Sequence, residues 1–262
     1  MKPSKAEELR AEAARKAAFE ARGGLERPAY AISPGMADFD AGAMVAALAE
    51  FGADLARLGH ANGTGYRPGN GYFDSPDAET LYLMMRRFRP ARVVEVGCGN
   101  STRITRQAIH DGGFDCRLTA IDPYPRADID GLADRFEQVG LEEVGTAIFD
   151  ALGPGDVLFI DSSHLVRIGN DVAHLFCRII PRLARGVVIH VHDVFLPYEY
   201  PNRFFHDCPS WGEQYVLHAL LQGGGYEMLW PGYLLQRERP ELRAALPFLA
   251  QGRAQSMWLR KR

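Results

Sequence analysis

Apolar residues recur along this chain in two rhythms. From residue 79 onward, short apolar runs alternate with longer segments in which apolar positions return every three or four residues. The short runs predict strands at 92–97, 117–122, 136–139, 156–161 and 186–193. Strands this short and apolar, separated by helices, are typical of a parallel sheet that is covered on both faces.

The segments between these runs predict helices, and the tail of the chain breaks the alternation. The expected helices are 79–88, 101–111, 128–135, 141–151, 168–184, 211–222 and 233–252. Two further strands, at 226–230 and 256–260, lack the spacing of a parallel crossover unit and predict an antiparallel pair. We therefore expect an α/β fold with a Rossmann-like, seven-stranded, mostly parallel sheet whose last strand pair is antiparallel.

The N-terminal part predicts a helical extension over residues 1–62, followed by the main domain over 63–262. Residues 3–22 are rich in Ala, Glu, Lys and Arg and end at two glycines, as a helix with a glycine stop does. Residues 38–59 predict a second helix with one apolar stripe, formed by Met44, Leu48, Phe51, Leu55 and Leu58. The stripe favours packing on the protein's own core, with a seam between two copies as the alternative.

Composition excludes several classes of protein. Apolar residues make up 47% of the chain and charged residues 24%, which predicts a packed core rather than disorder. A formal net charge of −3 argues against a nucleic-acid partner, whose binding usually requires a basic face. No apolar run is long enough to cross a membrane, and no secretion signal follows the charged start. The four cysteines are scattered, so we expect reduced thiols and a cytoplasmic location.

A glycine-rich turn carries the strongest chemical signal. It follows the 92–97 strand as Gly97-Cys98-Gly99 and leads into a helix that begins near Ser101 and Thr102. Glycines let a backbone turn sharply and approach a ligand closely, and free N–H groups at a helix start can bind a carboxylate. The dinucleotide fingerprint would need a third glycine where Thr102 stands, so the spacing disfavours a nicotinamide cofactor.

Asp122 ends the next strand, about 20 residues beyond the glycine turn. An acidic side chain there can accept hydrogen bonds from both hydroxyl groups of a ribose. The plainer alternative is an aspartate that caps the following turn. The glycine turn upstream favours the ribose.

The segment from the glycine turn onward resembles the class I methyltransferases that depend on S-adenosylmethionine (SAM). Their motif reads acidic–apolar–Gly–x–Gly–x–x–Thr, which this chain matches with Glu95, Val96, Gly97, Cys98, Gly99 and Thr102. The resemblance implies SAM as cofactor. It places Glu95 near the methionine amino group, the 97–99 turn along the methionine moiety, and Asp122 on the ribose, with Ser101 and Asp161 also among the cofactor-binding residues. It leaves the adenine-binding residues unassigned.

Ionisable side chains gather where two later strands end. Asp161 and His164 follow one strand, and His192 and Asp193 follow the next, so all should meet at the carboxyl edge of the sheet. Methyl transfer to oxygen or nitrogen requires removal of a proton, for which histidine has a suitable pKa. We therefore expect His164, His192 and Asp193 to be catalytic. Capping of local turns is the alternative, and we read His190 as a core residue.

A metal at this edge is the less favoured expectation. In catechol-type O-methyltransferases, a magnesium ion is bound by acidic and amide oxygens at the ends of corresponding strands, and Asp161 matches one of those positions. Histidine is a poor magnesium ligand but suits zinc, iron, nickel or copper. Because no spacing in the sequence enforces a coordination geometry, we expect a metal-independent enzyme.

The segment 195–211 follows the last parallel strand and is rich in aromatic residues. Such a segment predicts either a lid over the site, mobile without ligands, or aromatic packing that anchors a long loop. Taken together, these features predict a SAM-dependent methyltransferase that acts on an oxygen or nitrogen of a small or medium molecule, such as a sugar or secondary metabolite. The alternatives are an NAD-dependent oxidoreductase and a non-catalytic SAM-binding module. Assembly with a second copy of the chain remains open.

Overall fold

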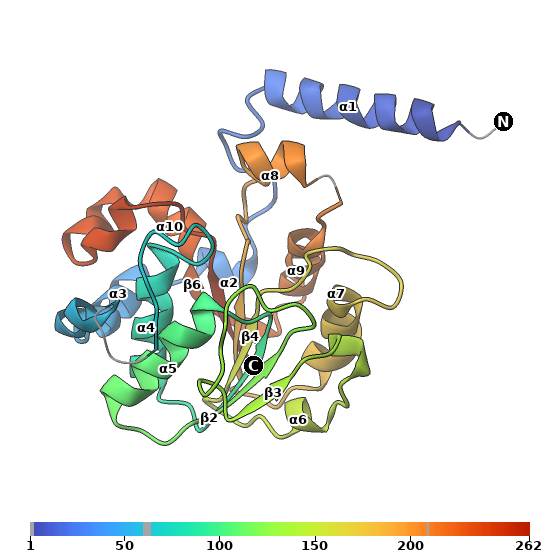
Figure 1. The fold of residues 1–262 in the computed structure, drawn as a ribbon. Coiled ribbons are helices and arrows are strands. Elements are labelled where there is room, and N and C mark those ends of the chain that lie inside the picture. Colours follow the sequence, from blue (N-terminus) through green and yellow to red (C-terminus); the bar gives the residue numbers. More distant parts are fainter. Residues whose placement is uncertain (1–2, 60–63, 209) are drawn as a thin grey trace.

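The computed structural model describes residues 3–59, 64–208 and 210–262. Its centre is a seven-stranded sheet in the order β3-β2-β1-β4-β5-β7-β6 (Figure 1). The strands are β1 (Arg92–Val96), β2 (Arg117–Ile121), β3 (Arg135–Glu137), β4 (Val157–Ile160), β5 (Val188–Val191), β6 (Tyr226–Pro231) and β7 (Met257–Lys261). All seven expected strands are present, and the predicted α/β fold class is confirmed.

The last strand, β7, lies between β5 and β6 and runs antiparallel to both. The first five strands pair in parallel, with β1 at the centre between β2 and β4. The expected antiparallel pair is therefore confirmed, and the pairing of β7 with β5 is a feature that the sequence pattern did not specify.

Successive strand residues point into two separate cores, one on each face of the sheet. Val94, Leu158 and Ile189 contribute to one core, whereas their chain neighbours Val93, Val157 and Val188 contribute to the other. Because side chains alternate across a strand, a sheet covered on both faces must be apolar at nearly every position. This is why the strands read as continuous apolar runs.

Helices cover both faces of the sheet. One face packs against α7 (Asp171–His174), the helical turns that continue it to Arg182, and α9 (Glu213–Gln222). The other face packs against α3 (Ala41–Ala49), α4 (Asp77–Phe88), α5 (Asn100–Gly112) and α10 (Gly232–Glu238). The remaining helices are α1 (Lys5–Ala21), α2 (Pro34–Ala37), α6 (Ala147–Asp150) and α8 (Asn202–Asp207).

Three expected helices are shorter than predicted. The 38–59 helix is α3 followed by a 3₁₀ turn, Gly52–Arg57, with Asp40 capping its start. The predicted 233–252 helix is present only as α10. The chain continues as two 3₁₀ turns that begin at Pro240 and Pro247, because proline cannot continue a helical hydrogen-bond ladder. The 141–151 helix is a 3₁₀ turn, Leu141–Glu143, followed by α6. The predicted stripe of 44–58 nevertheless packs on the core, as expected.

Two helical predictions need larger corrections. No helix forms at 128–135, where the side chain of Asp128 accepts a bond from the N–H of Asp130 and Gly131 has a φ of 70°, so the chain turns instead. The 168–184 helix begins at Asp171 and contains a π-helical stretch, Leu175–Ile179, before a 3₁₀ turn at Ile180–Arg182.

The predicted extension begins with α1, which projects away from the sheet and lies beside α8 (Figure 1). Ser4 and Glu7 form a capping box at its start. The ring of Phe19 stacks on Phe205, and the Lys16 amino group donates to the Phe205 carbonyl. Beyond α1, Met36 is buried in the main core. The proposed boundary at residues 62 and 63 lies outside the described residues. No helix in the described part of the chain is both long and apolar enough to span a membrane.

Candidate functional site

The glycine turn joins β1 to α5 at the carboxyl edge of the sheet. Gly97 has a φ of 78°, and a Cβ there would lie 2.0 Å from the backbone oxygen of Asp161. Gly97 is therefore required by the end of β4, a different reason from the ligand approach that the sequence suggested. Gly99 has a φ of 155°, and its N–H donates to the Thr102 hydroxyl at 2.9 Å. A Cβ at Gly99 would meet nothing closer than Ala127, at 3.7 Å, so this side of the turn is open.

Glu95 is buried beneath this turn, with 1% of its surface exposed. One carboxylate oxygen accepts a 2.6 Å bond from the Ser101 hydroxyl, and the other has no hydrogen-bond partner. Burial raises the pKa of Glu95 to about 8, although the hydroxyl groups of Ser101 and Thr102 act to lower it. A buried carboxylate oxygen without a partner is costly and is free to receive a cationic group from a ligand.

Asp122 lies where β2 ends, directly beside the glycine turn. Its carboxylate accepts bonds from the N–H of Cys98 at 2.9 Å and from the N–H of Tyr124 at 2.8 Å. The capping role weighed from the sequence is therefore real. It also fixes the carboxylate against the turn, and each oxygen retains a lone pair for a further donor. The Cys98 side chain is buried, and burial raises the pKa of its thiol.

The predicted strand-end residues meet in one cluster beside the glycine turn. The Nε2 atom of His164 lies 3.5 Å from Oδ1 of Asp161 and 3.3 Å from Oδ2 of Asp193. The Nδ1 atom of His192 lies 3.5 Å and 3.9 Å from the same two oxygens. One oxygen of Asp161 and one oxygen of Asp193 therefore lie within 4 Å of both rings. We call Asp161, His164, His192 and Asp193 the strand-end cluster.

Two carboxylates that were not predicted from the sequence lie beside the ring nitrogens that face away from Asp161 and Asp193. A carboxylate oxygen of Glu213, in the first turn of α9, lies 2.8 Å from Nδ1 of His164, within hydrogen-bond distance. Asp77, at the start of α4, lies 3.5 Å from Nε2 of His192 and accepts bonds from the N–H groups of Gln255 and Ser256. Both residues resemble ordinary acidic helix starts, so only the tertiary fold reveals their second role.

The carboxylates control the protonation of both rings. Burial lowers the pKa of His164, but Asp161 and Glu213 more than offset it and raise that pKa to about 10. Burial likewise opposes protonation of His192, while Asp193 and Asp161 raise its pKa well above the usual value. A protonated imidazole has no lone pair with which to accept a proton. Either ring would therefore have to release its proton before it could act as the base that the sequence suggested.

Aromatic rings and unusual backbone hold the cluster in place. Trp211 lies 4.2 Å from the ring of His164, and Phe73 lies 4.8 Å from the ring of His192. His164 and Asp193 both have left-handed backbone, with φ values of 60° and 55°. Left-handed residues other than glycine are uncommon and are concentrated at functional sites. Asp161 keeps 35% of its side chain exposed and so forms the open side of the cluster.

His190 lies in the core, as predicted. It is completely buried, its ring stacks on Phe159 at 4.0 Å, and its Nε2 pairs with the Ser256 hydroxyl at 2.9 Å.

The first half of the aromatic segment is an anchor. Phe195, Tyr198 and Tyr200 are buried in a separate small core with Tyr233. Glu199 accepts bonds from the hydroxyls of Tyr30 and Tyr215. The packing alternative therefore describes 195–200. The lid remains a prediction for α8 and the residues around it, of which 209 lies outside the described part of the chain.

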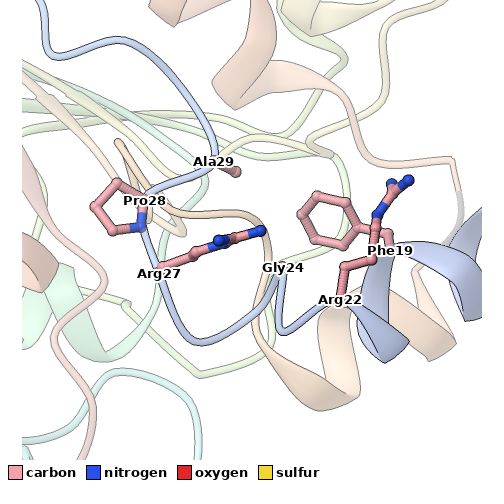
Figure 2. Close-up of a pocket in the computed structure, with 6 residues that line it drawn as sticks. All are labelled: Phe19, Arg22, Gly24, Arg27, Pro28 and Ala29. Atoms are coloured by element: carbon pink, nitrogen blue, oxygen red, sulfur yellow. The ribbon is translucent and has the colours of Figure 1, made fainter.

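A hollow near the N-terminus is separate from this site. Its lining comes from the last turn of α1 and the segment that follows this helix: Phe19, Arg22, Gly24, Arg27, Pro28 and Ala29 (Figure 2). None of these residues belongs to the glycine turn or to the strand-end cluster.

Comparison with known proteins finds a family match over the segment that contains the glycine turn and the strand-end cluster. Residues 94–194 match the family model described as a methyltransferase domain, which agrees with the resemblance noted in the sequence. No curated protein matches the chain. The match runs from β1 to just beyond β5.

Several solved structures are similar to the chain at low sequence identity. The SAH-bound Podospora anserina methyltransferase PaMTH1 is 14% identical, with 100% of this chain and 98% of that chain covered and a TM-score of 0.45. The plantazolicin methyltransferase BpumL in complex with SAH is 14% identical, with 84% and 99% covered and a TM-score of 0.42. The structure titled cmcI-N160 SAH is 16% identical, with 71% and 77% covered and a TM-score of 0.41.

Proposed function

We propose that this protein is a SAM-dependent methyltransferase that binds SAM at the glycine turn. The observation that carries the proposal is the unpartnered, buried oxygen of Glu95 beneath the glycine turn, within the segment that matches the methyltransferase family model. A cationic ammonium group, such as that of the methionine moiety, would satisfy this oxygen. SAM supplies a methyl group that is activated by the positive charge on sulfur.

The residues around Glu95 fit the other parts of the cofactor. The backbone at Gly99 is open on one side, because a Cβ there would meet only Ala127. Asp122 holds its carboxylate against the same turn through Cys98, at the position where a ribose would donate its hydroxyl groups. Ser101 and Thr102 act indirectly: the Ser101 hydroxyl orients Glu95, and Thr102 fixes the N–H of Gly99.

The acceptor we propose is a hydroxyl or amine of a small or medium molecule, held at the strand-end cluster. Asp161 joins the two halves of the site, because its backbone packs against Gly97 while its side chain faces His164 and His192. Alignment of acceptor and methyl group in one closed geometry supplies much of the rate enhancement in such reactions. His164, His192 and Asp193 form the polar wall against which the acceptor would be aligned, and a carboxylate of the strand-end cluster would take the acceptor's proton.

Calorimetric titration with SAM tests this function. The parent protein should bind SAM and not NAD. Asp122→Ala should weaken SAM binding by about 30-fold or more, because it removes charge-assisted hydrogen bonds that contribute about 2–4 kcal/mol. Asp130→Ala is the matched control, since Asp130 lies on the same loop and is exposed. Binding of NAD alone by the parent would overturn the proposal, and full SAM affinity in Asp122→Ala would remove Asp122 from the site.

A further inference from the structure

We infer that Tyr30 and Glu199 are positioning residues for the acceptor side of the site, and that they hold His164 in place through the first turn of α9. The inference rests on the proposed function, which places the acceptor at the strand-end cluster. Both residues lie outside the segment that matches the methyltransferase family model, Tyr30 by more than 60 residues. The N-terminal extension therefore contributes a side chain to the machinery of the site.

The carboxylate of Glu199 is the centre of a buried network. Glu199 is 8% exposed and accepts four hydrogen bonds. The donors are the hydroxyls of Tyr30 and Tyr215, the side-chain amide of Gln214 and the N–H of Tyr200. Burial and the charge of Glu199 raise the pKa of both Tyr30 and Tyr215, so their hydroxyls keep their protons and act as donors. A carboxylate with this many donors is fixed in place.

Gln214 connects this network to the start of α9. It is completely buried, and its side-chain amide donates to Glu199 at 3.2 Å. Its backbone N–H donates to the Tyr200 hydroxyl at 3.2 Å, and its side-chain oxygen accepts a 3.1 Å bond from the N–H of Phe195. Because backbone and side chain are both held, the first turn of α9 cannot shift without breaking several bonds.

Glu213 precedes Gln214 in the same turn and contacts His164. It is 1% exposed; one carboxylate oxygen accepts a 2.9 Å bond from the Ser162 hydroxyl, and the other lies 2.8 Å from Nδ1 of His164. The N–H groups of Gly212 and Glu213 donate to the His164 carbonyl, at 2.9 and 3.3 Å. One helix turn thus holds both the ring and the left-handed backbone of His164.

The position of His164 matters because its ring faces two carboxylates of the strand-end cluster. Its Nε2 atom lies 3.5 Å from Asp161 and 3.3 Å from Asp193. A misplacement of about 1 Å, caused by a change far from the reacting atoms, can lower a reaction rate by roughly 100-fold. Tyr30 and Glu199 act through other residues, so we class them as positioning residues rather than catalytic ones.

The plainer alternative is that the network only anchors the N-terminal segment. The N–H groups of Ala29 and Tyr30 already donate to the Pro197 carbonyl, at 2.9 and 3.0 Å, and this anchoring requires no buried carboxylate. The two roles predict different results. An anchor alone predicts lower stability with an unchanged His164 ring, whereas a positioning role predicts a change at the ring itself.

Nuclear magnetic resonance of the full-length protein, with ¹³C-labelled histidine rings and without SAM or acceptor, distinguishes them. The His164 signal is assigned by its loss in His164→Asn, and Glu213→Gln shows where it lies once the carboxylate is removed. Tyr30→Phe and Glu199→Gln should each shift the His164 signal toward its position in Glu213→Gln, because members of a buried polar network depend on one another. The signal of the exposed His110 should stay in place.

Tyr226→Phe is the matched control, since Tyr226 is a buried tyrosine on β6 outside the network. It should leave the His164 signal unchanged. Tyr30→Phe removes one hydroxyl from a half-buried side chain, so it keeps the test valid if Glu199→Gln does not fold. An unmoved His164 signal in folded Tyr30→Phe, or an equal shift in Tyr226→Phe, would overturn the inference. SAM titration judges the proposed function separately: both network variants should keep the affinity of the parent, and a parent that binds no SAM would leave the resonance result standing.

Discussion

At the scale of single residues, the site contains groups whose burial or backbone conformation lowers the stability of the folded protein. Glu95 is a buried carboxylate with one unpartnered oxygen, and His164 and Asp193 adopt left-handed backbone. Such features persist only where the surrounding structure holds them, and they concentrate at functional sites. Glu95 shows most directly how a cost in the free protein becomes useful when a ligand arrives.

Glu95 should make the stability of the free protein depend on pH. Its pKa is about 8 in the folded state, against an ordinary value of 4.5, so between these values the folded state holds a proton that the unfolded state lacks. The free energy of unfolding should therefore fall as pH rises from 5 to 8, by on the order of 1 kcal/mol per pH unit. Urea unfolding of parent and Glu95→Gln across this range measures it.

The Glu95→Gln variant should lose most of that slope and be more stable than the parent at pH 8, while binding SAM more weakly. A parent and variant with equal pH dependence would show that Glu95 is ionised in the free protein. Weaker stability of Glu95→Gln at pH 8 would contradict the prediction outright.

At the scale of elements, the question is whether the apolar stripe of α3 and the turn after it packs on the protein's own core or against a second copy of the chain. The stripe of 44–58 has Leu48 completely buried against the sheet, with Met44, Phe51, Leu55 and Leu58 packed around it. A helix whose apolar stripe is covered within its own chain does not need a partner.

Leu48→Ala should lower the free energy of unfolding by about 2–5 kcal/mol, because it leaves a cavity in the core. Leu9→Ala is the matched control: Leu9 is 58% exposed on α1, so its truncation should change stability by less than about 0.5 kcal/mol. Chemical denaturation measures both variants. A Leu48→Ala protein that keeps its stability but changes its mass in solution would instead favour a seam between copies.

At the scale of the whole molecule, the two ends of the chain contribute very differently. None of the residues of α1 is buried, and the helix meets the rest of the protein mainly through Phe19 and Lys16. By contrast, β7 is inserted between β5 and β6 and carries the completely buried Trp258. The last strand in the sequence is therefore an internal strand of the sheet.

Removal of residues 1–22 should leave a cooperatively folding protein that still binds SAM. Removal of residues 256–262 should abolish folding, because two neighbouring strands lose their hydrogen-bonded partner and both cores are opened. Circular dichroism during heating, together with SAM titration, measures the outcome. Cooperative unfolding after loss of β7 would show that the sheet closes without it.

The sequence by itself determined the strands, the parallel direction of the first five, the antiparallel last pair and the glycine turn, because these depend on local patterns: apolar runs for strands covered on both faces, and a sharp turn whose backbone favours glycine. It did not determine where helices end, because the helical spacing of apolar residues continues through prolines, Asx turns and a π-helical stretch that interrupt the helix itself. Nor did it reveal Asp77 and Glu213, which look like ordinary acidic helix starts. Only the tertiary structure decided that these carboxylates stand behind His192 and His164, because convergence of side chains from β4, β5, α4 and α9 depends on how distant elements pack.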